Sequence, residues 1–241
     1  MIVDKKRKVI YLHNPKCGGT FLRDLYIEKY GNTEATKWWK LYTCKYGTDL
    51  GHITYDDLPS FVPEWEEYRI VVMIRNPYNR FYSAVKELTQ KLKSCIGGRW
   101  YKKYPKIIKC PKLIKYEFIE SNWLRKIYLL TICPETYRLR KLSMASVNDI
   151  CNKIFYERSE QDYFIHNKRI PWLNPQSYFL GKNVEIFRYE SESDWIKLLE
   201  IFELSEYRNR LLIAKDYVIP EDFREMIKKV YPEDRELFLM Y

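Results

Sequence analysis

Two short polar segments of this chain contain residue types that bind phosphate and sulfate groups in proteins. Residues 14–20 read Asn-Pro-Lys-Cys-Gly-Gly-Thr, and residues 75–83 read Arg-Asn-Pro-Tyr-Asn-Arg-Phe-Tyr-Ser. Glycines let an anion approach the backbone, and a lysine adds a full positive charge. A guanidinium group can hold a phosphate with two hydrogen bonds, and a serine hydroxyl can add another. The alternatives are an ordinary turn with an exposed lysine, and an arginine that pairs with a nearby carboxylate.

The first segment is expected to lie between a strand and a helix. Residues 9–12 are apolar, aromatic or β-branched, which predicts a buried strand. Apolar residues recur at helical spacing from Phe21, and Gly31 is the expected end of that helix. A helix begins with backbone N–H groups that lack partners inside the helix, and its dipole is positive there. The order differs from the Walker loop G-x-x-x-x-G-K-[ST], because Lys16 precedes Gly18 and Gly19.

The second segment also follows a predicted strand. Residues 69–74 read Arg-Ile-Val-Val-Met-Ile and contain no breaker. Asn76 is the expected N-cap of the next helix, with Pro77 at its first position. Arg75 is therefore predicted at the carboxyl end of a strand, where open α/β sheets bind ligands.

In this order, the two segments resemble the sulfotransferase superfamily. The resemblance implies that the first segment cradles the 5′-phosphosulfate of 3′-phosphoadenosine-5′-phosphosulfate (PAPS), the sulfuryl donor of that family. It also implies that Arg75 and Ser83 bind the 3′-phosphate. The residues implied for the 5′ side are Lys16, Cys17, Gly18, Gly19, Thr20 and Phe21.

Other segments extend the resemblance toward carbohydrate sulfotransferases. Residues 51–55, Gly-His-Ile-Thr-Tyr, resemble a segment of the uronyl 2-O-sulfotransferase group in which a histidine is the proposed base. Residues 162–176 resemble an acceptor-side segment. Residues 184–190 resemble the late F-R-Y-E element and are expected as another buried strand, and residues 231–238 resemble the closing Y-x-x-D-x-x-L-F pattern.

The implied fold is α/β, with one domain over residues 1–241 and a P-loop-like parallel sheet flanked by helices. Residues 86–180 are expected as a helical and loop insertion that forms the acceptor side.

Sulfuryl transfer needs in-line geometry, charge stabilisation at the leaving oxygen and a base for the acceptor hydroxyl. Lys16 is the expected group at the leaving oxygen, and no metal is required. The chain has three histidines. We expect His52 to be the base, by elimination and by the resemblance, with a structural histidine as the alternative. His13 is expected to pack at the end of the first strand. His166 lies among cations, which suits acceptor contact, and Asp56 is a further candidate base.

Charge and cysteine content limit the classes of protein further. The net charge is +10, and residues 86–115 alone hold ten Lys or Arg residues and one acid, a net charge of +9. This segment predicts attraction of an anionic acceptor, and a solvated basic surface is the alternative. The six cysteines form no C-x-x-C pair, which predicts reduced thiols and no zinc site. Cys17 lies where a helix N-terminus lowers a thiol pKa, but a loop-backbone role is expected.

The N-terminal residues lack the apolar core of a secretory signal, and no apolar run is long enough to span a bilayer. A cytoplasmic location is therefore expected unless a targeting segment was removed.

The sequence thus predicts a PAPS-dependent sulfotransferase that acts on a hydroxyl acceptor, with a carbohydrate favoured. A tyrosine, lipid or small-metabolite acceptor stays open, as does the oligomeric state, and no stable nucleic-acid complex is expected. Two other classes stay open. A P-loop kinase needs a lysine after the glycines and an acidic Mg²⁺ ligand at a strand end, where this chain has Arg75. A basic polyanion or nucleic-acid binder would account for residues 86–115 but not for the two phosphate motifs.

Overall fold

The computed structural model describes residues 1–40, 49–96, 146–166, 171–211 and 216–241. The chain divides into two compact units. The first contains Met1–Ala84 and Glu157–Tyr241, and the second, Val85–Tyr156, is inserted between these stretches in the sequence. The first unit holds the sheet and both predicted phosphate-binding segments. An acceptor-side role for residues 86–180 stays a prediction.

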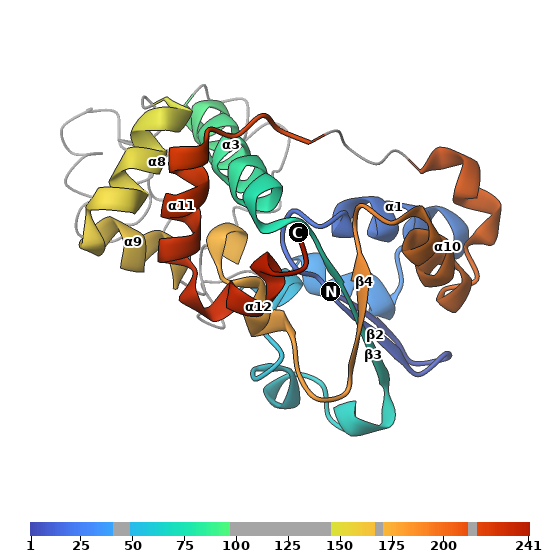
Figure 1. Ribbon diagram of the computed structural model, residues 1–241. Helices are drawn as coiled ribbons and strands as arrows, with labels where there is room; N and C mark the ends of the chain where they lie inside the picture. Colours follow the sequence, from blue (N-terminus) through green and yellow to red (C-terminus); the bar gives the residue numbers. More distant parts are fainter. Residues whose placement is uncertain (41–48, 97–145, 167–170, 212–215) are drawn as a thin grey trace, which may run out of the picture. The chain divides into compact units, whose positions relative to one another are not determined.

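A four-stranded sheet with the order β1-β2-β3-β4 forms the centre of the first unit (Figure 1). Its strands are β1 (Ile2–Asp4), β2 (Val9–Leu12), β3 (Arg69–Ile74) and β4 (Val184–Arg188). Strands β2, β3 and β4 are parallel, whereas β1 is antiparallel to β2. The sheet is therefore mixed, which corrects the expected parallel sheet. The three parallel strands bring their carboxyl ends to one edge.

The antiparallel strand β1 is joined to β2 by a short connection that a single carboxylate holds. Asp4 accepts hydrogen bonds from the backbone N–H groups of Lys6 at 3.0 Å and Arg7 at 3.1 Å, and it pairs with the Arg7 guanidinium at 2.6 Å. The Tyr26 hydroxyl donates to the same carboxylate at 2.9 Å. Burial raises the pKa of Asp4, but the hydrogen bonds from Arg7 and Tyr26 outweigh it and lower that pKa. These contacts stabilise β1, a strand that is too short to be predicted from a pattern of apolar residues in the sequence.

The two faces of the sheet are covered by different kinds of structure. Helices α1 (Gly19–Tyr30) and α10 (Glu192–Ile201) pack against the face that carries Tyr11, Val71 and Met73. Their buried side chains include Leu22, Leu25, Trp195, Leu198 and Leu199. Short 3₁₀ segments and loops cover the opposite face, where Ile10, Ile70 and Val72 contact a second cluster. Its members include Trp38, Leu50, Ile53, Leu58 and Phe179.

The remaining helices are α3 (Pro77–Ile96), α8 (Val147–Tyr156), α9 (Arg158–Ile165), α11 (Glu221–Val230) and α12 (Arg235–Phe238). The 3₁₀ helices are Glu34–Lys40, Leu50–His52, Leu58–Ser60, Trp65–Glu67, Pro171–Leu173, Gln176–Phe179, Ser205–Arg210 and Pro232–Asp234. Within the described ranges, no helix combines the length and the apolar character that a membrane crossing requires.

Local signals at helix ends are confirmed. Gly31 follows α1 and donates its N–H to the carbonyl of Ile27 at 2.8 Å. Asn76 caps α3, which begins at Pro77. A serine at 191 or 193 is likewise expected to cap a helix, and the structure has Ser191 as the cap of α10. Pro220, which is expected to open a helix, directly precedes α11. These residues act on their own neighbours in the chain, so the sequence suffices to place them.

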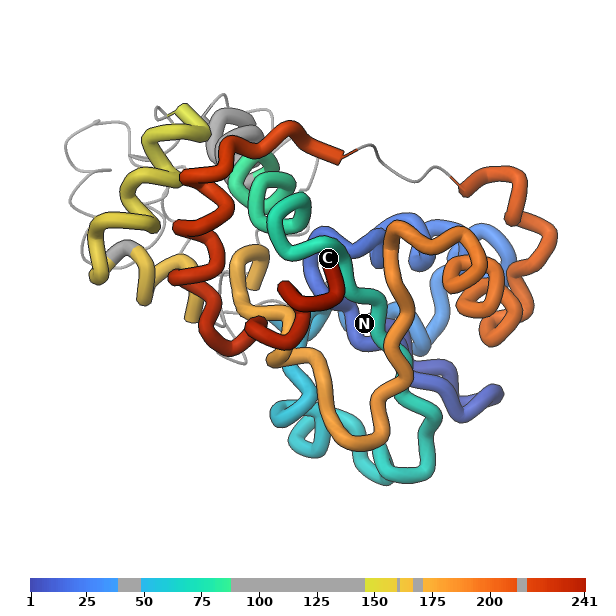
Figure 2. Tube along the Cα trace, viewed as in Figure 1, coloured from blue at the N-terminus to red at the C-terminus, as the bar shows by residue number. Residues whose placement is uncertain are grey.

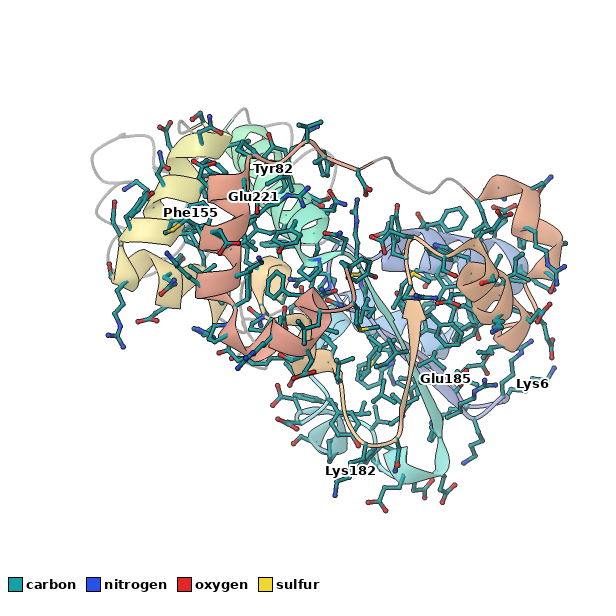
Figure 3. All side chains as sticks on the ribbon, in the orientation of Figure 1. Lys6, Tyr82, Phe155, Lys182, Glu185 and Glu221 are labelled. Carbon is teal, nitrogen blue, oxygen red and sulfur yellow. The ribbon has the colours of Figure 1, made fainter. Side chains whose placement is uncertain are left out.

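Strand β4 is not the buried strand that was expected. Phe187 is 2% exposed, whereas Ile186 is 44% exposed. Glu185, on the same strand, is exposed and is labelled in Figure 3. It pairs with Arg69 at 2.6 Å. Strand β4 is exposed because it forms one edge of the sheet. Of its residues, only Phe187 belongs to the core cluster that includes α10.

Candidate functional site

The loop between β2 and α1 presents backbone N–H groups without a side-chain cap. Its N-cap residue is Gly18, at φ 81°, and no side chain caps the helix. The first hydrogen bond inside the helix runs from the N–H of Leu22 to the carbonyl of Gly18 at 3.2 Å. The N–H groups of Gly19, Thr20 and Phe21 therefore precede the hydrogen-bonded ladder, as an anion site at a helix start requires. Lys16 also adopts positive φ, at 68°.

Both glycines of this loop are required by close contacts. A Cβ on Gly18 would lie 2.6 Å from the indole of Trp195, and its positive φ already disfavours a side chain. A Cβ on Gly19 would lie 1.9 Å from the imidazole of His13. The loop is therefore packed between an aromatic ring from α10 and an imidazole from the end of β2.

The second segment contributes a buried guanidinium. Arg75 follows β3 and is 4% exposed. Its Nη1 donates to the carbonyl of Lys16 at 3.2 Å, and its Cζ lies 4.6 Å from the ring centroid of Tyr189. Its Nε is buried without a hydrogen-bond partner, and no carboxylate of the described residues forms an ion pair with it. A buried cation without an anion is costly, so this group is suited to receive an anionic ligand.

Helix α3 begins differently from α1, because its first amides are already bonded. The side chain of Asn76 accepts from the N–H groups of Tyr78 at 3.1 Å and Asn79 at 3.3 Å. Pro77 has no N–H. Ser83 lies further along the helix and is 9% exposed. Among the described residues, no hydrogen bond joins Ser83 to Arg75, so these two predicted 3′-phosphate ligands are not directly connected.

A carboxylate also lies at this edge of the sheet. Glu190 accepts the N–H of Asn76 at 2.9 Å and the hydroxyl of Tyr241 at 3.0 Å. The last residues of the chain therefore return to the carboxyl end of β3 and β4, as the tube trace shows (Figure 2). Burial and the adjacent Glu190 raise the pKa of the Tyr241 hydroxyl.

Gln176 connects the two segments, and sequence reasoning did not select it as a site residue. Its Oε1 accepts from the N–H of Arg75 at 3.0 Å and from the Asn14 side chain at 2.9 Å, and its Nε2 donates to the carbonyl of Arg75 at 2.8 Å. Gln176 is fully buried. It is the last residue of the segment 162–176 that resembles an acceptor-side segment, but no local pattern indicates these distant contacts.

Cys17 is buried in the loop. Its Sγ lies 3.5 Å from Oε1 of Gln176, and burial raises the thiol pKa to about 12. The pKa lowering that a helix N-terminus favours is thus outweighed by desolvation. Cys17 is a packing residue of the loop and does not supply a thiolate at neutral pH.

His52 lies beside the same loop. Its Nδ1 is 2.9 Å from the carbonyl oxygen of His13, and the two imidazole centroids are 4.1 Å apart. Because a carbonyl only accepts, Nδ1 of His52 carries the proton and Nε2 carries the lone pair in the neutral ring. Burial and the adjacent His52 lower the pKa of His13 well below its ordinary value, so His13 stays neutral.

The other candidate bases have different surroundings. His166 is exposed at the end of α9, with Nδ1 2.9 Å from the hydroxyl of Tyr178, and Asp56 is exposed. Apart from Lys86 and Glu87, whose burial is defined, the side chains of the basic segment 86–115 lie outside the described residues. In the part of the chain that the structure describes, no group of three or more His, Cys, Asp or Glu residues could hold a metal ion.

In comparisons with known proteins, the chain matches no family model, no curated protein and no solved structure.

Proposed function

We propose that this protein is a sulfotransferase that moves a sulfuryl group from PAPS to a hydroxyl acceptor, with a carbohydrate as the favoured acceptor class. The observation that carries the proposal is the contact between two unlike anion-binding groups. The guanidinium of Arg75 donates to the carbonyl of Lys16 at 3.2 Å, which joins it to the loop that precedes α1. A nucleotide with phosphates at both ends of its ribose matches such a pair.

The residues present fit this nucleotide. The N–H groups of Gly19, Thr20 and Phe21, with Lys16, suit the 5′-phosphosulfate, because a helix start and a lysine both favour negative charge. The buried Nε of Arg75, which lacks a hydrogen-bond partner, suits the 3′-phosphate. Ser83 is retained as a further 3′ ligand on the resemblance alone. The P-loop-like character of the fold is part of this proposal.

PAPS, when bound, supplies the sulfuryl group and a phosphate as the leaving group. Lys16 stabilises the negative charge that develops on the leaving oxygen, and the loop amides hold the group in line with the acceptor. His52 accepts the proton of the acceptor hydroxyl at Nε2 while its Nδ1–H remains bonded to the carbonyl of His13. The imidazole is thereby held in the tautomer that a base requires.

The acceptor side is assigned to residues 86–180 on the resemblance. The net charge of +9 over residues 86–115 favours an anionic acceptor, such as an acidic carbohydrate. A kinase is disfavoured, because Arg75 follows β3 at the position where that class uses an acidic Mg²⁺ ligand.

Calorimetry tests the nucleotide assignment. We expect adenosine 3′,5′-bisphosphate to bind without added metal, more tightly than ATP with Mg²⁺ and more tightly than adenosine 5′-phosphate. Labelled PAPS with a panel of acidic and neutral saccharides then identifies the acceptor. Preferential binding of ATP with Mg²⁺ would contradict the proposal.

A further inference from the structure

We propose that Gln176 is a positioning residue that fixes the distance between the two anion-binding groups and so makes the site selective for nucleotides with two phosphates. This inference rests on the proposed function. It concerns a residue between the two groups and assigns no contact with the nucleotide to it.

The side chain of Gln176 bonds to both groups at once. Toward β3, it holds the backbone of Arg75 from both sides, with Oε1 3.0 Å from the N–H and Nε2 2.8 Å from the carbonyl oxygen. Toward the loop, the same Oε1 accepts from the Asn14 side chain at 2.9 Å and lies 3.5 Å from Sγ of Cys17. One amide group therefore links the start of the loop to the residue that carries the guanidinium.

Only an amide of this length satisfies the arrangement. The carbonyl of Arg75 needs a donor, whereas its N–H and the Asn14 side chain need an acceptor. A glutamate lacks the donor at neutral pH, and an aliphatic side chain lacks both groups. All these groups are buried, so each bond that is lost leaves an unsatisfied polar atom.

The backbone of Gln176 is itself fixed. The buried carboxylate of Asp234 accepts the N–H groups of Gln176 at 2.9 Å and Ser177 at 2.8 Å. The hydroxyl of Tyr231 donates to the carbonyl of Leu173 at 2.7 Å. The C-terminal part of the first unit therefore holds Gln176 in place, and Gln176 in turn holds the two anion-binding groups.

A fixed distance has a measurable consequence. When two groups are held at the separation of two phosphates on one nucleotide, the second phosphate binds without a further ordering cost. When the groups move independently, the second phosphate contributes less. The relevant quantity is the ratio between the dissociation constant of adenosine 5′-phosphate and that of adenosine 3′,5′-bisphosphate.

Calorimetry on the full chain measures this ratio in three variants. In Gln176→Met, which keeps the length, we expect the ratio to fall about tenfold, while affinity for the monophosphate falls only about threefold. Gln176→Glu, which keeps the acceptors and loses the donor, should lower the ratio less. Ser177→Ala is the matched control, because its side chain bonds to neither group, and it should retain the wild-type ratio.

The outcomes separate the two proposals. A wild-type ratio near one contradicts the proposed function, and the role of Gln176 falls with it. A large wild-type ratio that persists in folded Gln176→Met supports the proposed function and overturns the role of Gln176. An equal loss for both nucleotides assigns Gln176 a purely structural role. If Gln176→Met does not fold, Asn14→Ala removes the loop side of the link, together with the hydrogen bond that the Asn14 side chain donates to the carbonyl of Met73 at 3.1 Å, and must lower the ratio in the same sense.

Discussion

The two strand–loop–helix units of the sheet, β2–α1 and β3–α3, begin their helices in opposite ways. Helix α1 has Gly18 as its N-cap and no side-chain cap, so its first N–H groups precede the hydrogen-bonded ladder without a bond to a capping side chain. Helix α3 begins with Asn76 and Pro77, and its first amides are bonded within the protein. The β3–α3 segment supplies the guanidinium of Arg75 in place of free helix amides. In the proposed site, two adjacent parallel strands thus supply two different kinds of partner for an anion, namely backbone amides and a side chain.

This difference matters for the proposed site, because the two groups are held in place by different kinds of contact. The backbone amides at the start of α1 are held by close packing. Gly18 and Gly19 make this packing possible, because a side chain at either position would collide with Trp195 or His13. The guanidinium is fixed by what surrounds it, namely the carbonyl of Lys16, the ring of Tyr189 and the bridge through Gln176. The first group depends on local backbone geometry and the second on tertiary contacts.

We expect the largest loss of activity from a change of His52, the imidazole beside the loop that precedes α1. His52→Ala should reduce kcat by about 10²–10⁴-fold, because a general base is lost, while nucleotide affinity is retained. Turnover of the wild-type protein should fall at acid pH, since a protonated imidazole cannot accept a proton. The assay follows labelled sulfate transfer to the identified acceptor. His166→Ala is the comparison variant: because His166 is expected to contact the acceptor, this variant should raise the KM for the acceptor and retain kcat. If the loss occurs in His166→Ala instead, the base is misassigned.

Gly19→Ala tests whether α1 binds its anion through the backbone. The added Cβ would lie 1.9 Å from the imidazole of His13, so the loop must shift. We expect both adenosine 5′-phosphate and the bisphosphate to bind about a hundredfold more weakly by calorimetry, in a protein that circular dichroism shows to be folded.

The matched control is Gly31→Ala at the other end of the same helix. Gly31 also has positive φ, at 76°, but a Cβ there would meet no atom within 4 Å. This variant should lose about 1 kcal/mol of stability and no nucleotide affinity. Wild-type affinity in Gly19→Ala would contradict backbone binding at α1.

A smaller effect is expected when the cap of α3 is removed. Asn76→Ala leaves the N–H groups of Tyr78 and Asn79 without their acceptor. The free energy of unfolding, measured with urea, should fall by about 1 kcal/mol. The N-cap of α1 is a glycine, so Thr20→Ala in its first turn removes no cap, and its effect should stay within about 0.5 kcal/mol. Equal losses in the two variants would show that the helix starts do not differ in this way.

Sequence reasoning predicted the elements whose signals are local. The strands at residues 9–12 and 69–74, the helix ends at Gly31 and Ser191, and the cap at Asn76 all follow from neighbouring residues, and the structure contains them. The loop residues and Arg75 lie at one edge because parallel strands align their carboxyl ends.

Features that depend on distant contacts were missed. Gln176 is 162 residues from Asn14 and 101 residues from Arg75 in the chain, so no spacing rule connects them. The thiol of Cys17 was placed correctly in the loop, but its burial, which raises the pKa, follows only from the packing around it. The exposure of β4 likewise depends on its place at the edge of the sheet.

The most direct test of the two kinds of anion site is calorimetry on Arg75→Ala with adenosine 5′-phosphate and adenosine 3′,5′-bisphosphate. Arg75 is assigned to the 3′-phosphate, and a buried charge-assisted hydrogen bond contributes about 1.5–3 kcal/mol. We therefore expect the bisphosphate to bind about 10- to 100-fold more weakly, while the monophosphate binds nearly as in the wild type. Equal losses for the two nucleotides, or no loss for either, would contradict the separation of the site into an amide group at α1 and a guanidinium group at β3.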